Sequence, residues 1–415
     1  MSSRSEFLII GGGVIGAACA MELATRGAGV TLVERGEIGH GCSYGNAGWL
    51  TPSLATPLPA PGMLLTCLKW MADPESPLYI HPRPSLELAR WLLRFARSMN
   101  RADFERGSRA LIALSKWSLE AYERMSRELP DSFGFERRGL LMLGLTGAGV
   151  ASARRELDLA ERHGLTGTPL DADGVRALEP AITGRIAGGV HFTGEGHLEP
   201  LLAVRAMTAE AERRGARIVR GCEVFGADVA GRRLEGLRTT RGRLTADRYV
   251  LATGSWSKKL AAGLGLRIPV LGGKGYAILI TPTEPMPRLP IKVTELRVAI
   301  TPRQGSLRLA GTLEVVDGDE SISPRRVDAI LRGSRQVLNV PATPEVVEVW
   351  RGLRPCTPDG MPVIGFARSL PNLFIATGHQ MCGLHTAPAT GRLAADLLTG
   401  ATPLFDPAPF RADRF

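Results

Sequence analysis

The sequence predicts an α/β protein of two domains: a doubly wound domain, and a second α+β domain built on a mixed or antiparallel sheet. Three observations predict this fold. A glycine-rich turn joins an apolar strand to a helix near the N-terminus, strand-like runs rich in β-branched residues occur later, and 415 residues with 44% apolar content provide a large core. Two domains are expected, because a domain typically has about 50 to 250 residues.

The N-terminal segment has the spacing of a dinucleotide-binding fingerprint. Phe7 to Ile10 is an apolar run of strand type and Ala17 to Arg26 is predicted to be helical; between them, at GxGxxG spacing, lie Gly11, Gly13 and Gly16. A second strand, Val30 to Val33, ends at Glu34, near the position of an acidic residue that binds ribose hydroxyls. The pattern predicts a Rossmann-like domain with phosphates at the helix N-terminus. By itself it does not distinguish NAD from FAD, and a glycine-rich turn without a ligand is the alternative.

Two later apolar runs favour a flavin. Tyr249 to Gly254 and Phe374 to Gly378 both end in the tripeptide ATG, which an NAD domain does not require. The sequence HQMCG follows the second run and precedes a predicted helix from Leu384 to Leu398. The positive end of this helix dipole would face the loop from Gly378 to Gly383, and it suits an anionic reduced flavin.

Charge and cysteine spacing restrict the partners and the setting. The formal net charge of +10 comes mostly from scattered Arg residues, so we expect no nucleic-acid partner. The six cysteines form no CxxC pair, and this favours a reduced, cytoplasmic setting without a metal site. The apolar stretch from Phe7 to Met21 is shorter than the roughly 20 residues of a membrane span, so we interpret it as part of the fold.

Four motifs carry a resemblance to a known family. IIGGGVIGAACAMELATRG with VER, then GCSYGNAGWLTPS, LRPCTPDGMPVIG and ATGHQMCGLHTAPATGRLAADLL, resemble the D-amino-acid oxidase superfamily of FAD enzymes. Within it the chain looks most like bacterial D-amino-acid dehydrogenases, and the GNAG and APATG segments also resemble 4-hydroxy-D-proline dehydrogenases. The likeness is weaker from Thr56 to about Pro344.

The resemblance implies a set of cofactor-binding residues. It assigns the ADP portion to the N-terminal fingerprint, the pyrophosphate and flavin to the GNAG loop, the adenine to one backbone position, and the isoalloxazine ring to the C-terminal loop. These residues are Gly11, Gly13, Val14, Ile15, Gly16, Glu34, Arg35, Ser43, Asn46, Ala47, Gly48, Val224, Gly254, Gly378, His379, Gly383 and Leu384. We expect FAD to bind non-covalently, because the offset of Cys356 from TPD differs from that in relatives that attach flavin covalently.

The implied reaction is transfer of a hydride from the amine-bearing carbon of a D-amino acid to flavin N5, with electrons passed to a quinone or partner protein. One alternative is a glycine or sarcosine type oxidase that produces hydrogen peroxide. The resemblance places Arg308 where such oxidases often carry a Lys, and this weakens the oxidase interpretation. A non-catalytic flavoprotein subunit and an NAD-dependent dehydrogenase are further alternatives.

Three residues are candidates for contact with the substrate. Arg354, in GLRP, resembles the Arg that binds the substrate carboxylate in the family, and a guanidinium suits a carboxylate because it donates two parallel hydrogen bonds. The alternatives are a structural ion pair with Glu348 or Asp359, or Arg351 in the same role. The second candidate is Tyr276, which either closes the pocket or is a half-buried strand residue. The third is His379, which either contacts the flavin or substrate or is hydrogen-bonded by backbone groups.

The expected FAD-binding domain comprises 1–55, 195–262 and 345–415, and the substrate domain comprises 56–194 and 263–344. In the latter, Thr66 to Leu129 is helical in period with a Pro-rich interruption from Pro74 to Pro84. Between Ser85 and Phe104, four Arg residues share one helical face and an apolar set shares the other. We interpret this segment either as a peripheral membrane contact or as an ordinary helix packed on the core, and we favour the latter.

Overall fold

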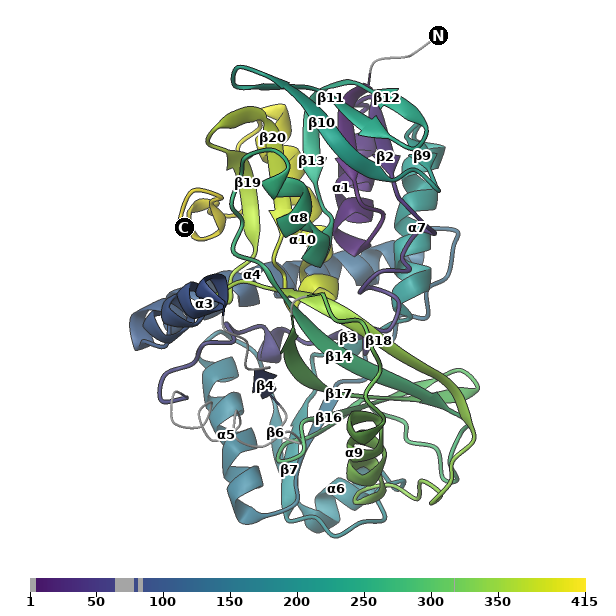
Figure 1. Ribbon diagram of the computed structural model, residues 1–415. Helices are drawn as coiled ribbons and strands as arrows, with labels where there is room; N and C mark the ends of the chain where they lie inside the picture. The colour runs from purple at the N-terminus through teal and green to yellow at the C-terminus, as the bar shows by residue number, and fades with distance from the viewer. Residues whose placement is uncertain (1–4, 64–77, 81–84, 317) are drawn as a thin grey trace.

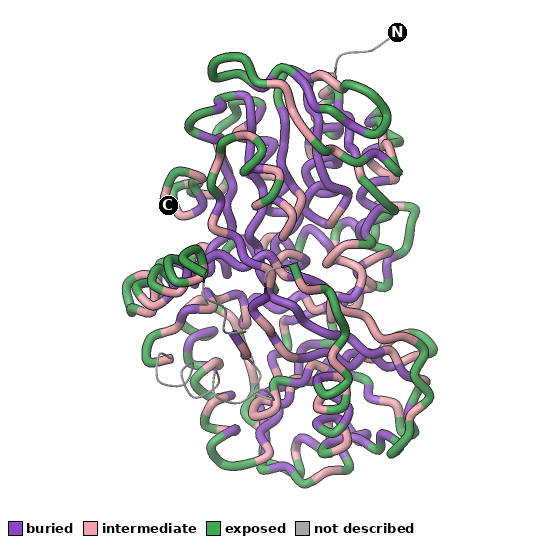
Figure 2. The backbone as a smooth tube through the Cα atoms, viewed as in Figure 1, coloured by how far each residue is buried: buried purple, intermediate pink, exposed green. Residues whose placement is uncertain are grey.

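The computed structural model describes residues 5–63, 78–80, 85–316 and 318–415. Figure 1 shows two halves, one above the other, each built on its own large sheet. The helix predicted to start at Thr66 and the interruption from Pro74 to Pro84 therefore lie largely outside the described residues. Buried residues fill the middle of both halves, and exposed residues lie toward the outside (Figure 2).

In the described chain the first half is built on a six-stranded sheet in the order β19-β20-β13-β1-β2-β9, parallel except for the β19–β20 pair. The strands are β1 (Ser5–Ile10), β2 (Val30–Val33), β9 (Arg217–Val219), β13 (Ala246–Leu251), β19 (Val363–Ala367) and β20 (Leu370–Thr377). Along β1, Phe7 and Ile9 enter one core while Leu8 and Ile10 enter another, as the alternation of a strand requires. A parallel sheet buried on both faces is the Rossmann-like arrangement that the sequence predicts.

Helices cover one face of this sheet and a small sheet covers the other (Figure 1). The helical face consists of α1 (Val14–Thr25), α4 (Arg101–Glu128), α7 (Pro200–Arg213) and α10 (Gly383–Thr399). The opposite face carries α8 (Ser257–Ala262) and an antiparallel sheet of β10 (Val224–Ala230), β11 (Arg233–Thr239) and β12 (Gly242–Leu244). The strand predicted from Arg217 to Val224 is thus divided between two sheets, because the chain turns at Gly221, whose φ is +60°.

The second half is built on a mixed sheet in the order β18-β14-β17-β16-β15-β5-β7-β6, with β4 paired to β17 among the described strands. All pairs are antiparallel except β15–β5 and β17–β4. The strands are β4 (Leu78–Ile80), β5 (Leu140–Gly144), β6 (Thr168–Asp171), β7 (Gly188–Phe192), β14 (Leu271–Ile280), β15 (Ile291–Val293), β16 (Val298–Arg303), β17 (Ser306–Val316) and β18 (Val346–Cys356). The predicted α/β class with a second, mixed-sheet α+β part is confirmed.

The remaining elements pack on this sheet or connect the halves. They are α3 (Leu86–Arg97), α5 (Gly147–Glu161), α6 (Ala172–Leu178), α9 (Pro324–Arg335), the strand pair β3 (Trp49–Leu50) and β8 (Gly196–His197), and the short helices η1 (Pro52–Leu54), η2 (Gly254–Trp256) and η3 (Ala408–Phe410). Two elements differ from the expected division of the chain. Helix α4 packs against α10 in the first core, and β18 pairs with β14 in the second sheet. No local pattern indicates which core α4 or β18 joins, because the apolar face of a helix or a buried strand can pack in either one.

Candidate active site

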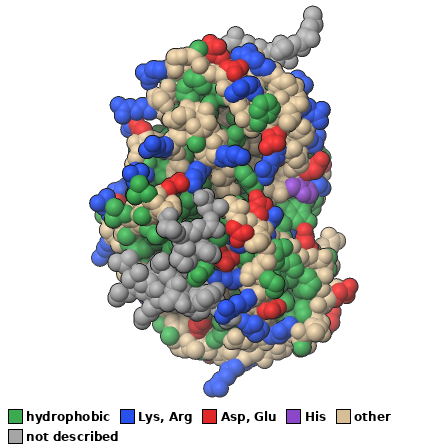
Figure 3. Space-filling view, viewed as in Figure 1, with side chains coloured by type: hydrophobic (Ala, Val, Ile, Leu, Met, Phe, Trp, Pro, Cys, Tyr) green, Lys and Arg blue, Asp and Glu red, His purple; other side chains and the backbone are tan. Residues whose placement is uncertain are grey.

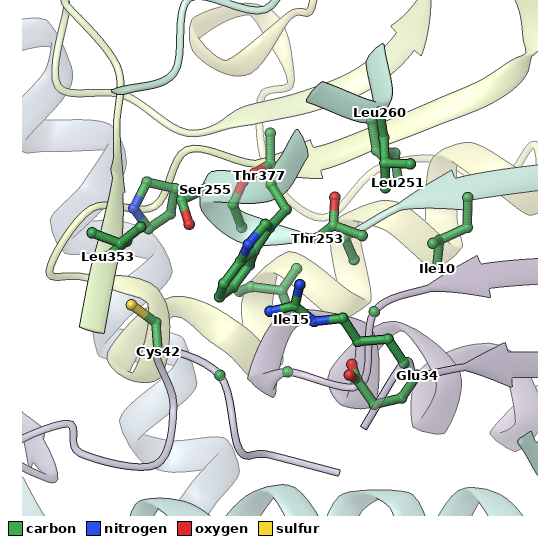
Figure 4. A pocket seen from close by; sticks show the side chains of 18 of the residues that line it. Ile10, Ile15, Glu34, Cys42, Leu251, Thr253, Ser255, Leu260, Leu353 and Thr377 are labelled. Carbon is green, nitrogen blue, oxygen red and sulfur yellow. Dashed lines mark hydrogen bonds between the residues drawn. The ribbon is translucent and has the colours of Figure 1, made fainter. Parts of the chain in front are cut away.

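A cavity of about 700 Å³ lies where the parallel strands of the first sheet end and meet the C-terminal half of β18 from the second sheet. This volume falls within the roughly 300–1,000 Å³ that is usual for small-molecule sites. In the close-up, Glu34, Ile10 and Leu251 lie at one end of the cavity, and Cys42 and Leu353 lie at the other (Figure 4). The cavity is therefore elongated from the nucleotide-binding sheet toward the second half.

Backbone amides and one carboxylate shape the first end. Glu34 accepts hydrogen bonds from the amide of Gly12 through Oε2 at 2.7 Å and from the amide of Gly36 through Oε1 at 3.0 Å. Ser43 Oγ accepts from the Val14 amide at 3.0 Å and so binds one of the free N–H groups at the start of α1. These contacts hold the turn between β1 and α1 in one conformation, with a helix N-terminus suited to phosphate.

Close packing of α1 against β1 requires glycine at two positions of this turn. A Cβ at Gly16 would lie only 1.9 Å from the carbonyl oxygen of Gly11, so no side chain fits there. Gly11 itself has φ +108° and leaves no room for a side chain next to Ala252. Gly11 therefore permits the tight turn, and Gly16 permits the close packing of helix on strand.

Most of the residues expected to contact the cofactor line the cavity. These are Gly11, Gly13, Val14, Ile15, Glu34, Arg35, Ser43, Asn46, Val224, Gly254, His379, Gly383 and Leu384. The lining does not include Gly16, which packs on β1, or Ala47, Gly48 and Gly378. Ala47 accepts a hydrogen bond from Thr301 through its carbonyl, and this contact fastens the GNAG loop to β16.

His379 lies at the second end and is held by the protein. The ring is 4% exposed, and Nε2 is 3.1 Å from Oγ1 of Thr390 in α10. Burial lowers the pKa of His379 to about 3, so the imidazole is neutral at physiological pH. His379 therefore lines the cavity as a neutral group, not as a cation or a proton store.

Arg354 is not part of the cavity lining but lies next to it, and it has no carboxylate partner among the described residues. Its neighbours Leu353 and Pro355 line the cavity, and its Nη1 donates to the carbonyl of Thr312 at 2.8 Å. Among the described residues, the two carboxylates considered as partners are engaged elsewhere: Glu348 accepts from Tyr44, and Asp359 pairs with Arg414. Burial lowers the pKa of Arg354, and the neighbouring groups that oppose this shift are thiols, those of Cys42 and Cys356.

Arg351, the rival to Arg354, has its charge compensated. Its Nη2 lies 2.7 Å from Oε2 of Glu320, and both residues line the cavity. Of the two arginines, Arg354 therefore has the charge that still requires an anion.

Two residues lie elsewhere than the sequence led us to expect. Tyr276 is 1% exposed, is absent from the cavity lining, and donates its hydroxyl to Oε2 of Glu314 at 2.6 Å. The register of β14 directs this side chain into the second core. Tyr276 therefore does not close the pocket, and that expectation is corrected. Arg308, expected above the flavin, also lies outside the lining, and its Nη1 donates to the carbonyl of Asn46 at 2.5 Å.

Two tryptophans of the lining were missed by sequence reasoning. Trp256 lies under Arg35, with Cζ 4.2 Å from the ring centroid, and its position two residues after an ATG run was an available signal. Trp350 lies against Gly45 and Gly352, at both of which a Cβ would be 2.0 Å from the indole. No local pattern marks Trp350, because β18 reaches the cavity only through its pairing with β14.

Comparison with known proteins identifies the family. A family model described as FAD dependent oxidoreductase matches residues 6–397. The chain belongs to this family. FAD is accordingly the cofactor, as the sequence predicts, and the residues fit it: a glycine turn with free helix amides and a carboxylate at one end, and the C-terminal loop at the other.

Relatives of this flavoprotein include amino-acid oxidoreductases. A D-amino acid dehydrogenase from Cereibacter sphaeroides is 31% identical over 417 residues, covering 99% of this chain and 95% of the relative. The structure of glycine oxidase from Geobacillus kaustophilus matches with a TM-score of 0.80 and 25% identity, covering 99% of each chain. L-proline dehydrogenase from P. horikoshii matches with a TM-score of 0.75 and 21% identity over 97% of this chain and 95% of the other, a likeness of fold.

Proposed function

We propose that this flavoprotein is a D-amino-acid dehydrogenase that passes electrons to an acceptor other than oxygen, either a quinone or a partner protein. Its family and a 31% identical relative named D-amino acid dehydrogenase support the class of reaction. D-proline and 4-hydroxy-D-proline are the substrates we favour, from the GNAG and APATG segments.

The observation that carries this proposal is the charge of Arg354 beside the cavity, which no carboxylate of the described residues compensates. A partly buried guanidinium without a carboxylate partner is unfavourable in the free protein, and an anionic ligand relieves the cost. The planar group presents parallel donors that match a carboxylate, so the ligand we infer is an amino acid bound by its carboxylate.

FAD, when bound, supplies the acceptor for a hydride from the substrate carbon. The residues of the chain then have to bind, orient and shield the substrate. Arg354 orients the carboxylate, and His379 stays neutral and is held by Thr390. Apolar side chains of the lining, among them Val14, Ile15, Leu353 and Leu384, exclude water from the cavity. No protein base is needed if the amine enters neutral, because the carbon then loses only a hydride.

Reduction of the bound flavin by amino acids tests the proposal. We expect one or more D-amino acids, both prolines included, to bleach the flavin band near roughly 450 nm without oxygen and to reduce an artificial dye. The L-amino acids serve as the matched controls. If no D-amino acid bleaches the band, the proposed function is wrong and a non-catalytic flavin subunit is favoured.

The second candidate function is a glycine-type amine oxidase, and the 0.80 TM-score with a glycine oxidase favours it. The two functions differ in their reaction with oxygen. Hydrogen peroxide released in proportion to substrate in air would establish the oxidase, whereas the dehydrogenase should show oxygen-independent dye reduction.

A peripheral membrane contact through Ser85 to Phe104 has weaker support. No helix in the described ranges is long and apolar enough to cross a bilayer. In α3 the apolar face is occupied, since Trp91 and Phe95 are 3% and 4% exposed and Trp91 donates to the carbonyl of Pro269. Leu86 and Leu93 remain exposed next to the arginines. On the face seen in Figure 3, Lys and Arg alternate with Asp and Glu and form no continuous basic surface.

A further inference from the structure

Thr312 of β17 contacts Arg354 from across an intervening strand. In the sheet order β18-β14-β17, Arg354 reaches over β14, and its Nη1 donates to the carbonyl of Thr312. The path is open because Gly275 of β14 has no side chain; a Cβ there would lie 2.2 Å from the same nitrogen. The glycine and the contact together place Thr312 at the guanidinium.

Thr312 has an uncommon backbone conformation at a β-bulge. Its φ is +59°, in the left-handed region that β-branched residues rarely adopt. Lys274 pairs with Glu314 but Tyr276 pairs with Gly311, so an additional residue of β17 is inserted opposite Gly275. Bulges change the direction of the groups they contain and are common beside binding sites. Here the bulge turns the Thr312 carbonyl toward Arg354.

The hydroxyl of Thr312 is buried and has no hydrogen-bond partner within the part of the chain that the structure describes. An unpaired buried hydroxyl destabilises the free protein, as does a guanidinium without a counterion. Both groups lie at Thr312, whose carbonyl holds Nη1 of Arg354. Neither residue is in the cavity lining, but Leu353 and Pro355 beside Arg354 are, and the guanidinium has further N–H groups. A single anion with two oxygens would satisfy both.

We propose that Thr312 is a second substrate-binding residue whose hydroxyl donates to the substrate carboxylate alongside Arg354. This inference rests on the proposed function and adds to it a side chain that the family likeness does not assign. Arg354 supplies the charge and the fork of donors, and the Thr312 hydroxyl fixes one carboxylate oxygen.

The test uses the FAD-loaded enzyme and the amino acid that reduces it fastest in the screen described above. Thr312→Val removes the hydroxyl and keeps the branched shape. We expect KM to rise about tenfold or more, because a hydrogen bond to a charged group is stronger than one between neutral groups. The values of kcat and FAD content should change little. Thr312→Ser restores the hydroxyl and should return KM close to the original. Thr294 provides the matched control: its hydroxyl is also buried without a partner in the described chain, but it follows β15, whose neighbours β16 and β5 are not the strands around Arg354, so Thr294→Val should leave KM unchanged.

Each outcome decides between the two proposals. If Arg354→Lys raises KM but Thr312→Val does not, Thr312 has no role in binding while the proposed function stands. If Thr312→Ser raises KM as much as Thr312→Val, the residue acts through the shape of the bulge and the inference is wrong. If the unmodified enzyme is reduced by no amino acid, both proposals fail together.

Discussion

Replacing Gly16 by Ala tests the geometry on which the nucleotide end of the cavity depends. The added Cβ would lie 1.9 Å from the Gly11 carbonyl oxygen, whereas an ordinary carbon–oxygen contact is about 3.3 Å. Helix α1 and strand β1 must therefore separate by more than an ångström. The carbonyl belongs to the backbone of the tight turn, so no side chain can move aside to make room.

The expected cost is that of an overpacked core, about 1–3 kcal/mol. If all of it acts on the bound form, FAD affinity falls roughly 5- to 150-fold, at about 1.4 kcal/mol for each factor of ten. We therefore expect Gly16→Ala to be purified with little flavin and to need high FAD concentrations for saturation.

Gly147 offers a matched control in the same kind of position. It begins α5, and a Cβ there would meet nothing within 4 Å. Gly147→Ala should bind FAD normally and gain up to about 1 kcal/mol of stability, because alanine loses less backbone freedom in a helix. The measurements are the ratio of flavin to protein absorbance after purification and the Kd from FAD titration of the apoprotein. Stoichiometric flavin and an unchanged Kd in Gly16→Ala would refute the packing argument.

Two further predictions concern stability and location. Glu195 is 2% exposed and burial raises its pKa to about 8, so the folded protein retains a proton that the unfolded chain releases above a pKa near 4.5. The stabilisation by this proton is thus complete below pH 4.5 and is lost as pH rises through about 8. Glu195→Gln should remove this pH dependence of the melting temperature. A constant difference in melting temperature between the two proteins from pH 5 to 8 would contradict the argument. Because the apolar face of α3 packs on the core, we expect the enzyme not to co-sediment with vesicles of anionic lipid. Co-sedimentation would instead establish a membrane contact if it is lost when the exposed Leu86 and Leu93 are replaced by Ser.

The sequence determined the nucleotide-binding half in detail, because its signals are local. The order of strand, glycine turn and helix, and the acidic residue at the end of the next strand, depend on spacing within about thirty residues. The two ATG runs end at the same cavity, since β13 and β20 are parallel neighbours whose carboxyl ends meet at one edge of the sheet.

Only the tertiary structure decided how the second sheet meets the cavity. Arg354, Gly275 and Thr312 come together through the register of β18, β14 and β17, and that register is set by long-range pairing that no local pattern encodes. The same register turns Tyr276 toward Glu314 and away from the pocket, while Trp350 lies against Gly45 from a segment about 300 residues earlier. The motifs, together with the family resemblance that they carry, were thus sufficient to predict the cofactor, whereas the surroundings of the substrate depend on which strands lie side by side.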